Sequence, residues 1–430
     1  MMELSPLLKI FSVFAAMLVL GRLKVPLGAS LVLGGLAINW WGGNSIPEVF
    51  KNFIQALAQV NLWLLVAVTA LTVEFGRELA DRKNAAAMQS LGSRLGGKSG
   101  RMWSLMIIPA LIGLMPMPAG ALLSAPLVQQ NVHEPHWKPE WKAAVNYWFR
   151  HVWEYWWPIY TAVIIGIAVF KMETWRFIAT TFPFTPAAII FGYWFLVRPH
   201  RARLRSGDFS APHDLRKFLN LIWPLLVIIA FVLVMPPITA RFFPWLDAQT
   251  NKLIAMLAGI ICGLGMIWLR ARNEAGLFAS FFKKHNLNIL MTVGSIMIFQ
   301  YLLEKSGLLP AASQKLVNSG ISIIPIIAIL PFLAGFITGI ASGFAGIAFP
   351  IVAGLIGAGT AGMPPMAALA LAFGFGYMGM LVSPIHLCLL MTRDYFSASL
   401  WPIYRQLLPC VALQTVFIVV VFVMFKGLNI

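Results

Sequence analysis

Apolar runs long enough to cross a lipid bilayer recur along the whole of this 430-residue chain. A helix needs about 20 such residues to span a hydrocarbon core roughly 30 Å thick. Only 11% of the residues are charged, whereas a soluble domain carries about 25%. The sequence therefore predicts an all-α polytopic membrane protein, whose apolar surface requires the lipid bilayer as its partner.

The apolar runs predict about ten transmembrane helices in two sets of five. They lie near 4–20, 24–41, 59–79, 143–170 and 182–197, then near 218–236, 250–269, 286–304, 365–392 and 402–425. Each set also contains an apolar region interrupted by Gly and Pro, at 104–130 and at 321–358. Arms of about 11–16 residues are short for a full crossing, so these regions predict two re-entrant hairpins. Their breaks are expected at Met115–Gly120 and Gly339–Gly346.

Three landmarks recur in the same order in both halves of the chain. The separation of Glu78 from Glu304 equals that of Pro158 from Pro384, and the separation of Pro126 from Pro350 is almost the same. A recurrence of this kind indicates a duplication. It predicts a first repeat at 1–200, a basic linker at 201–217 and a second repeat at 218–430. Five crossings per repeat is an odd number, so the two repeats are expected to have inverted topology.

The basic residues indicate how the chain is oriented in the membrane. The formal net charge is +17, which we interpret as a topology signal and not as a nucleic-acid surface. A cytoplasmic linker at 198–217 puts roughly 23 of the basic residues on the cytoplasmic side, as the positive-inside rule requires. We therefore expect a multi-pass protein of the bacterial inner membrane with both termini outside.

The two predicted hairpin tips are candidate substrate contacts. Unwound backbone within the membrane exposes N–H groups at helix starts and C=O groups at helix ends, which suit anions and cations. The candidate substrate-binding residues here are Pro118, Ala119, Gly120, Ser124, Ser342 and Gly343. The alternative is that Gly and Ser at these positions only permit close helix packing.

The segment 146–158 is the most unusual in the chain, because it places Arg, His and Glu inside an apolar span. Charged residues at that depth usually face a cavity and have a function. Arg150 can clamp a carboxylate or phosphate, with Asn146 on the same helix face. His151 and Glu154 are candidates for proton coupling. Two alternatives remain: an aromatic belt at the membrane interface, or a cation–π pocket for a cationic substrate.

The corresponding segment of the second half has a glycine-rich break followed by Ser383 and His386. Both are candidate substrate-binding residues at the unwound point of a discontinuous helix. A histidine that only caps a freed carbonyl is the alternative for His386. The three cysteines have no metal-ligand spacing, so the sequence predicts no particular metal site. No cofactor is expected apart from Na⁺ or H⁺ as a coupling ion.

Four segments carry a resemblance to a known family: MPMPAGALLSAP, NYWFRHVWEYWWPIY, GIASGFAGIAFP and GYMGMLVSPIHLCLL. Over essentially its whole length the chain resembles the domain of unknown function 401 family, a branch similar to the ion transporter superfamily of dicarboxylate, citrate and gluconate carriers. The resemblance implies a carrier with paired hairpins and a possible homodimer. The Ser-Asn-Thr motifs that bind carboxylate and sodium in the dicarboxylate carriers are missing from both tips.

These features together predict a secondary active transporter that moves a small, carboxylate-like organic anion by alternating access, coupled to protons or sodium. The alternatives are a carrier or exporter of a cationic or amphipathic substrate, and a membrane-embedded enzyme. The chain contains no HExxH, GxSxG or Walker sequence, so no enzymatic activity is expected.

Overall fold

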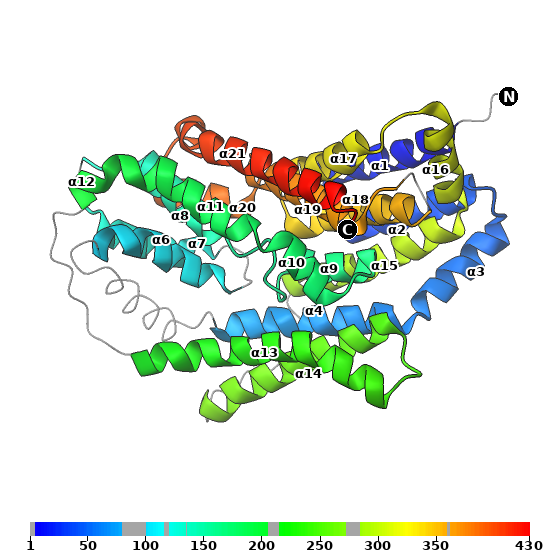
Figure 1. Ribbon diagram of the computed structural model, residues 1–430, viewed down its shortest axis with the longest axis horizontal. Helices are drawn as coiled ribbons and strands as arrows, with labels where there is room; N and C mark the ends of the chain where they lie inside the picture. Colours follow the sequence, from blue (N-terminus) through cyan, green and yellow to red (C-terminus); the bar gives the residue numbers. More distant parts are fainter. Residues whose placement is uncertain are drawn as a thin grey trace.

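The computed structural model describes residues 5–79, 100–115, 120–134, 136–204, 215–271, 284–358 and 362–430. Within these ranges the chain is helical, without a β-strand (Figure 1). Two predicted site residues, Pro118 and Ala119, lie outside the described residues.

The first three predicted spans of each half form six helices. They are α1 (Pro6–Arg22), α2 (Leu27–Trp41), α4 (Val60–Leu79), α13 (Leu215–Phe242), α14 (Ala248–Ala271) and α15 (Lys284–Lys305). Helix α2 of the first half packs on α15 of the second, and α14 of the second half packs on α4 of the first. A Cβ at Gly28 would lie 3.1 Å from the Ser295 hydroxyl, and the buried Asn39 amide donates to the Leu302 carbonyl at 2.8 Å. Small residues and a buried polar contact therefore join these helices, as is typical within membranes.

Two pairs of short helices occupy the predicted hairpin regions. They are α6 (Gly100–Gly113) with α7 (Ala121–Asn131), and α17 (Ile324–Thr338) with α18 (Ala341–Gly357). The second turn is shorter than predicted, since only Gly339 and Ile340 separate its helices. Gly339 has a φ of +64°, which favours glycine. The prediction that the break extends to Gly346 is therefore wrong.

Gly343 and Gly346 lie inside α18 because they serve packing. A Cβ on Gly346 would lie 2.7 Å from the Ile296 side chain, and one on Gly343 would lie 2.1 Å from the Thr338 hydroxyl. Contacts with neighbouring elements thus offset the low helix propensity of glycine. Ser342 is in the first turn of α18 and is partly buried.

Each hairpin is followed by a broken helix. The first consists of α8 (Pro139–Arg150) and α9 (Thr161–Phe170), and the second of α19 (Pro365–Leu381) and α20 (Leu387–Tyr395). Pro158 and Pro384 lie in the two breaks, where a residue without a backbone N–H is tolerated. Because α8 and α9 are 12 and 10 residues long, the first break lies near the middle of its segment.

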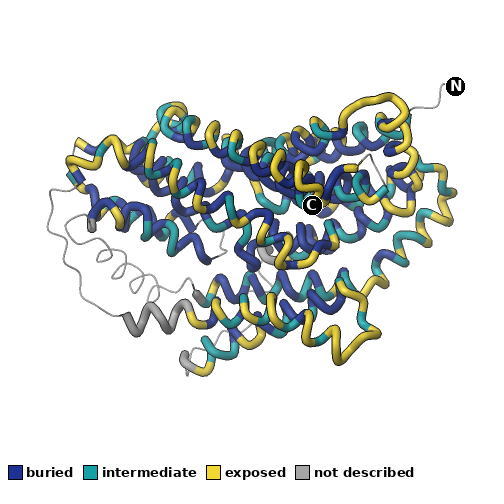
Figure 2. The backbone as a smooth tube through the Cα atoms, viewed as in Figure 1, coloured by how far each residue is buried: buried dark blue, intermediate teal, exposed yellow. Residues whose placement is uncertain are grey.

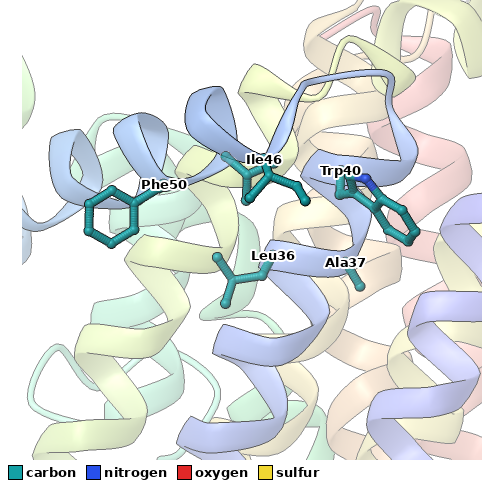
Figure 3. Close-up of a pocket in the computed structure, with 6 residues that line it drawn as sticks. Leu36, Ala37, Trp40, Ile46 and Phe50 are labelled. Atoms are coloured by element: carbon teal, nitrogen blue, oxygen red, sulfur yellow. The ribbon is translucent and has the colours of Figure 1, made fainter.

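The remaining elements complete the two halves. The first half ends with α10 (Thr174–Thr181), α11 (Phe184–Gly192), the π-helical turn η2 (Tyr193–Val197), η3 (Arg198–His200) and α12 (Arg201–Leu204), and the second half ends with α21 (Leu400–Gly427). Helices α3 (Ile46–Leu57) and α16 (Leu308–Ser319), like α10, lie outside the predicted spans. An open apolar groove of about 380 Å³ lies between α2 and α3, lined by residues that include Leu36, Trp40 and Phe50 (Figure 3).

The outer surface of the helices is apolar. Buried residues concentrate where the helices pack, and exposed residues follow the periphery (Figure 2). Exposed large side chains include Trp223 and Leu226 on α13 and Val416, Val420 and Val423 on α21. Such extended apolar exposure is incompatible with water and fits lipid.

Among the described residues, six helices are long and apolar enough to cross a membrane. They lie at Val60–Glu78, Thr174–Leu204, Trp223–Phe242, Ala248–Leu269, Leu287–Lys305 and Leu400–Gly427. Shorter apolar helices lie in the predicted spans 24–41, 143–170 and 365–392 and in the two predicted hairpin regions. The breaks that contain Pro158 and Pro384 divide the second and third of these spans. The total of ten spans, the inverted repeats and the orientation of the termini stay predictions.

Candidate functional site

The two breaks lie against each other in the interior of the protein, and tyrosines join them. The Tyr377 hydroxyl of α19 donates to the His151 carbonyl at 2.7 Å, and the Tyr147 hydroxyl of α8 donates to the Leu381 carbonyl at 2.9 Å. All four residues are buried. Backbone carbonyls freed by the interruption of each helix are therefore satisfied by the opposite half, as buried carbonyls must be.

Arg150 is the centre of a buried polar cluster at the end of α8. Its guanidinium donates to the Glu154 carboxylate at 3.3 Å, to the Tyr160 hydroxyl at 3.2 Å and to the Met115 carbonyl at 3.3 Å. Only 1% of the Arg150 surface is exposed. The cluster thus connects the first break to Met115, which is the last described residue before the first hairpin tip. A buried charge of this kind is tolerated only when it is paired and hydrogen-bonded.

Two histidines face each other across the breaks. The Nε2 atoms of His151 and His386 are 3.3 Å apart. Nδ1 of His151 lies 2.6 Å from the Tyr147 carbonyl oxygen, and Nδ1 of His386 lies 2.8 Å from the Gly339 carbonyl oxygen. His386 therefore caps the freed Gly339 carbonyl through Nδ1, which was the alternative interpretation of this residue. Its Nε2 atom faces His151 in the first half. Glu154 lies 3.9 Å from His151 Nε2.

Other predicted residues lie around this cluster. The Asn146 amide donates to the Ala121 carbonyl at 3.1 Å, at the start of the second arm of the hairpin, and Ser124 Oγ donates to the same carbonyl at 3.2 Å. Gly120 precedes α7 and is buried. Ser383 Oγ donates to the Phe336 carbonyl at 2.7 Å, near the second tip. The bonds of Asn146 and Ser383 therefore connect each broken helix to the hairpin that precedes it.

Several site residues were not predicted from the sequence. Tyr160 bridges Arg150 and the Gly113 carbonyl, and Cys388 lies with the two histidines. A signal for Tyr160 exists, because it precedes His386 by the same spacing that relates Pro158 to Pro384. No comparable signal marks Cys388, because only the tertiary structure places His151 beside it.

Glycines let the hairpins approach the broken helices backbone to backbone. A Cβ on Gly113 would lie 2.2 Å from the Arg150 carbonyl oxygen, and a Cβ on Gly335 would lie 2.2 Å from the Gly376 carbonyl oxygen. No side chain larger than hydrogen fits at either contact. Gly113 and Gly335, which were not singled out from the sequence, therefore serve close packing.

The tryptophans of the first break do not form a continuous belt at the surface. Trp148 and Trp157 are buried, with 3% and 7% of their surface exposed. The Trp148 indole donates to the Ala188 carbonyl at 2.8 Å. The indole N–H groups of Trp156 and Trp157 are buried without a hydrogen-bond partner among the described residues. An unsatisfied buried donor is costly and marks a place where an acceptor can bind.

The fold and this buried polar junction define an α-helical membrane protein with two pairs of short helices, each followed by a broken helix. Solved structures that share the fold include two transport proteins. The Alcanivorax borkumensis YdaH transporter has a TM-score of 0.57 and 15% identity, over 89% of each chain. Neisseria gonorrhoeae MtrF, described among antimetabolite efflux pumps, has a TM-score of 0.57 and 12% identity, over 88% of this chain and 83% of that one.

The chain belongs to the family described as protein of unknown function (DUF401), whose profile matches residues 3–425. The resemblance stated from the sequence is thereby confirmed for this family. Membership of the wider dicarboxylate, citrate and gluconate carrier superfamily stays a prediction. No curated protein matches the chain in sequence.

Proposed function

We propose that the protein is a secondary active transporter that binds a small organic anion at the junction of the two broken helices. Transport occurs by alternating access and is coupled to protons or sodium. The observation that carries the proposal is Arg150, a buried guanidinium hydrogen-bonded beside a hairpin tip. A guanidinium in such a place matches the geometry of a carboxylate.

The arrangement of the hairpins supports the same conclusion. Broken helices and hairpin tips near the centre of a membrane protein are where secondary transporters bind substrate and coupling ion. YdaH and MtrF share this fold, and one is named a transporter and the other an efflux pump. At their low identity the likeness supports the architecture and leaves the substrate to the residues of this chain.

The predicted residues take complementary roles in this proposal. Arg150 binds the carboxylate, and the amide of Asn146 holds the start of α7 beside it. Further contacts come from the first tip and α7, through Pro118, Ala119, Gly120 and Ser124, and from the second half, through Ser342, Gly343 and Ser383. Glu154 competes with the substrate for Arg150, because it already accepts from that guanidinium.

A cationic or amphipathic substrate is the second candidate. Trp153, Trp156 and Trp157 form an aromatic group beside the site, with ring centroids 5.2–6.1 Å apart. Aromatic faces attract cations by about 0.5–2 kcal/mol each. The buried indole donors at Trp156 and Trp157 favour an acceptor, such as an anion, over a cation.

The test measures thermal unfolding of the purified protein in detergent with mono-, di- and tricarboxylates, sulfonates and phosphates. Each ligand is added with and without sodium, at acidic and neutral pH. A ligand that binds only the folded state stabilises it by about 2.7 kcal/mol at 100-fold excess over its Kd. Arg150→Lys keeps the charge but loses the planar fork, and Arg393→Lys is the matched control at a surface ion pair with Asp394.

The expected result is stabilisation by one anion class in the wild type and in Arg393→Lys, reduced in Arg150→Lys. Uptake or exchange of that anion by proteoliposomes then establishes transport and its coupling ion. Stabilisation by cationic or neutral amphiphiles alone would contradict the anion proposal and favour the aromatic group as the pocket.

A further inference from the structure

We propose that His151, His386 and Cys388 form a binding site for a transition-metal ion of the Zn²⁺ type at the junction of the two broken helices. The ligand atoms of these three buried residues all lie within 4.8 Å of one another. Two of the ligands are imidazoles and the third is a thiol, the combination that Zn²⁺ prefers in proteins. His151 comes from the first break, and the other two residues begin α20 in the second half.

The contacts of the two imidazoles aim one ring nitrogen of each histidine at the other histidine. Each Nδ1 faces a backbone carbonyl oxygen, that of Tyr147 or of Gly339. A carbonyl only accepts, so each Nδ1 carries the ring hydrogen and each Nε2 of a neutral ring presents a lone pair. The two lone pairs face each other at 3.3 Å. Such an arrangement is repulsive unless a proton or a metal ion lies between them. The Cys388 thiol, which hydrogen-bonds to His151, is the third group at this place.

The distances suit a tetrahedral ion. Two nitrogens bound to Zn²⁺ at about 2.0–2.1 Å are about 3.3–3.4 Å apart in tetrahedral geometry. The observed separation of the two Nε2 atoms is 3.3 Å. A sulfur and a nitrogen bound to the same tetrahedral Zn²⁺ are about 3.5 Å apart, so Cys388, within 4.8 Å of both histidines, must approach by no more than about 1.3 Å. The Glu154 carboxylate, 3.9 Å from His151 Nε2, is the nearest candidate for the fourth position.

The surroundings of both histidines resemble those of metal ligands. A ligating histidine almost always donates its other N–H to a carbonyl or carboxylate, which fixes the tautomer and orients the ring. Both histidines make that contact here. Because its ligands come from both breaks, a bound ion would hold the two halves of the protein together at the proposed substrate site.

The experiment uses the full chain, purified without a polyhistidine tag and stripped with a chelator. Zn²⁺ binding is measured by elemental analysis and competition titration, and Co²⁺ replaces Zn²⁺ for absorption spectroscopy of thiolate coordination. The variants are Cys388→Ser, His386→Asn and His151→Asn. Asparagine keeps a donor close to the position of Nδ1, so the carbonyl contact is preserved while the Nε2 ligand is lost. Cys410→Ser is the matched control, because Cys410 is also buried.

The expected result is one tightly bound Zn²⁺ per chain in the wild type and in Cys410→Ser. Each of the three ligand variants should bind Zn²⁺ at least about tenfold more weakly, and Cys388→Ser should lose the thiolate-to-Co²⁺ band. Absence of Zn²⁺ uptake by the wild type would overturn the proposal and assign a shared proton to the histidine pair. Equal uptake by the wild type and the ligand variants would also overturn it. Both readouts are independent of transport, so they do not depend on the proposed anion substrate.

Discussion

Tyr160 and His386 make the same contact at corresponding positions in the two halves of the protein. The Tyr160 hydroxyl donates to the carbonyl of Gly113, and Nδ1 of His386 donates to the carbonyl of Gly339. Gly113 and Gly339 are separated by the same spacing as the two donors, and each lies where the first arm of a hairpin ends. Each broken helix is therefore tied to its own hairpin by one side-chain donor just after the proline.

Replacement of Tyr160 should loosen the first hairpin. In Tyr160→Phe the Gly113 carbonyl loses a buried donor and Arg150 loses an acceptor. The expected cost is about 1–3 kcal/mol in the free energy of unfolding, the usual result of unsatisfied buried groups. The measurement is denaturant unfolding in detergent, with the exposed Tyr395→Phe as control. An equal effect of both substitutions would show that the contact does not hold the hairpin.

Alanine at the close backbone contacts should prevent the hairpins from packing. The Cβ of Gly113→Ala or Gly335→Ala would overlap a carbonyl oxygen at 2.2 Å. A backbone atom cannot move aside as a flexible side chain can, so we expect a loss of about 3 kcal/mol or more, or no folded protein. Gly265→Ala has nothing within 4 Å of its Cβ and should change stability by less than about 1 kcal/mol. Yield and thermal midpoint after purification distinguish these outcomes.

Removal of the Arg150 charge alone should be more harmful than removal of both charges of the pair. Arg150→Gln leaves the buried Glu154 carboxylate without its cation, at an expected cost of about 3–5 kcal/mol. The double variant Arg150→Gln/Glu154→Gln leaves no unpaired charge and should recover most of that stability. A double-mutant cycle of unfolding free energies measures the coupling. A purely additive result would mean that the two groups do not stabilise each other.

The ion pair at the loop between α7 and α8 should make stability depend on pH. Arg101 donates to the Glu134 carboxylate and holds its pKa at about 2, below the usual 4.5. A lowered carboxyl pKa stabilises the fold above the unfolded pKa, and that contribution is lost as the pH falls from about 4.5 towards 2. Glu134→Gln should therefore lose up to about 1 kcal/mol at neutral pH and little at pH near 2. The thermal midpoints of the variant and the wild type should converge on acidification, whereas a difference independent of pH would rule out the ionic contribution.

Helix positions followed from the sequence because bilayer thickness and backbone hydrogen bonding leave few choices. Apolar runs placed α13, α14, α15 and α21 close to their observed bounds. The span predicted as continuous over 143–170 is instead interrupted between Arg150 and Thr161. The extent of the second tip was mispredicted because glycine has two uses. At Gly339 it allows a left-handed turn, and at Gly346 it makes room for Ile296. A sequence pattern does not distinguish these uses, since the difference lies in the neighbouring helix.

The candidate site also combines residues that the sequence identified with contacts that it did not predict. Arg150, His151, Glu154 and His386 could be selected from the sequence, because polar groups inside apolar spans are costly and therefore conspicuous. The sequence by itself determined that this chain is a helical membrane protein, and it marked polar residues inside the apolar spans as candidates for the site. Only the tertiary structure decided that His151 meets His386 and Cys388, which lie in the other half of the chain. Contacts between segments so distant depend on how the two breaks pack, and local periodicity carries no information about that packing.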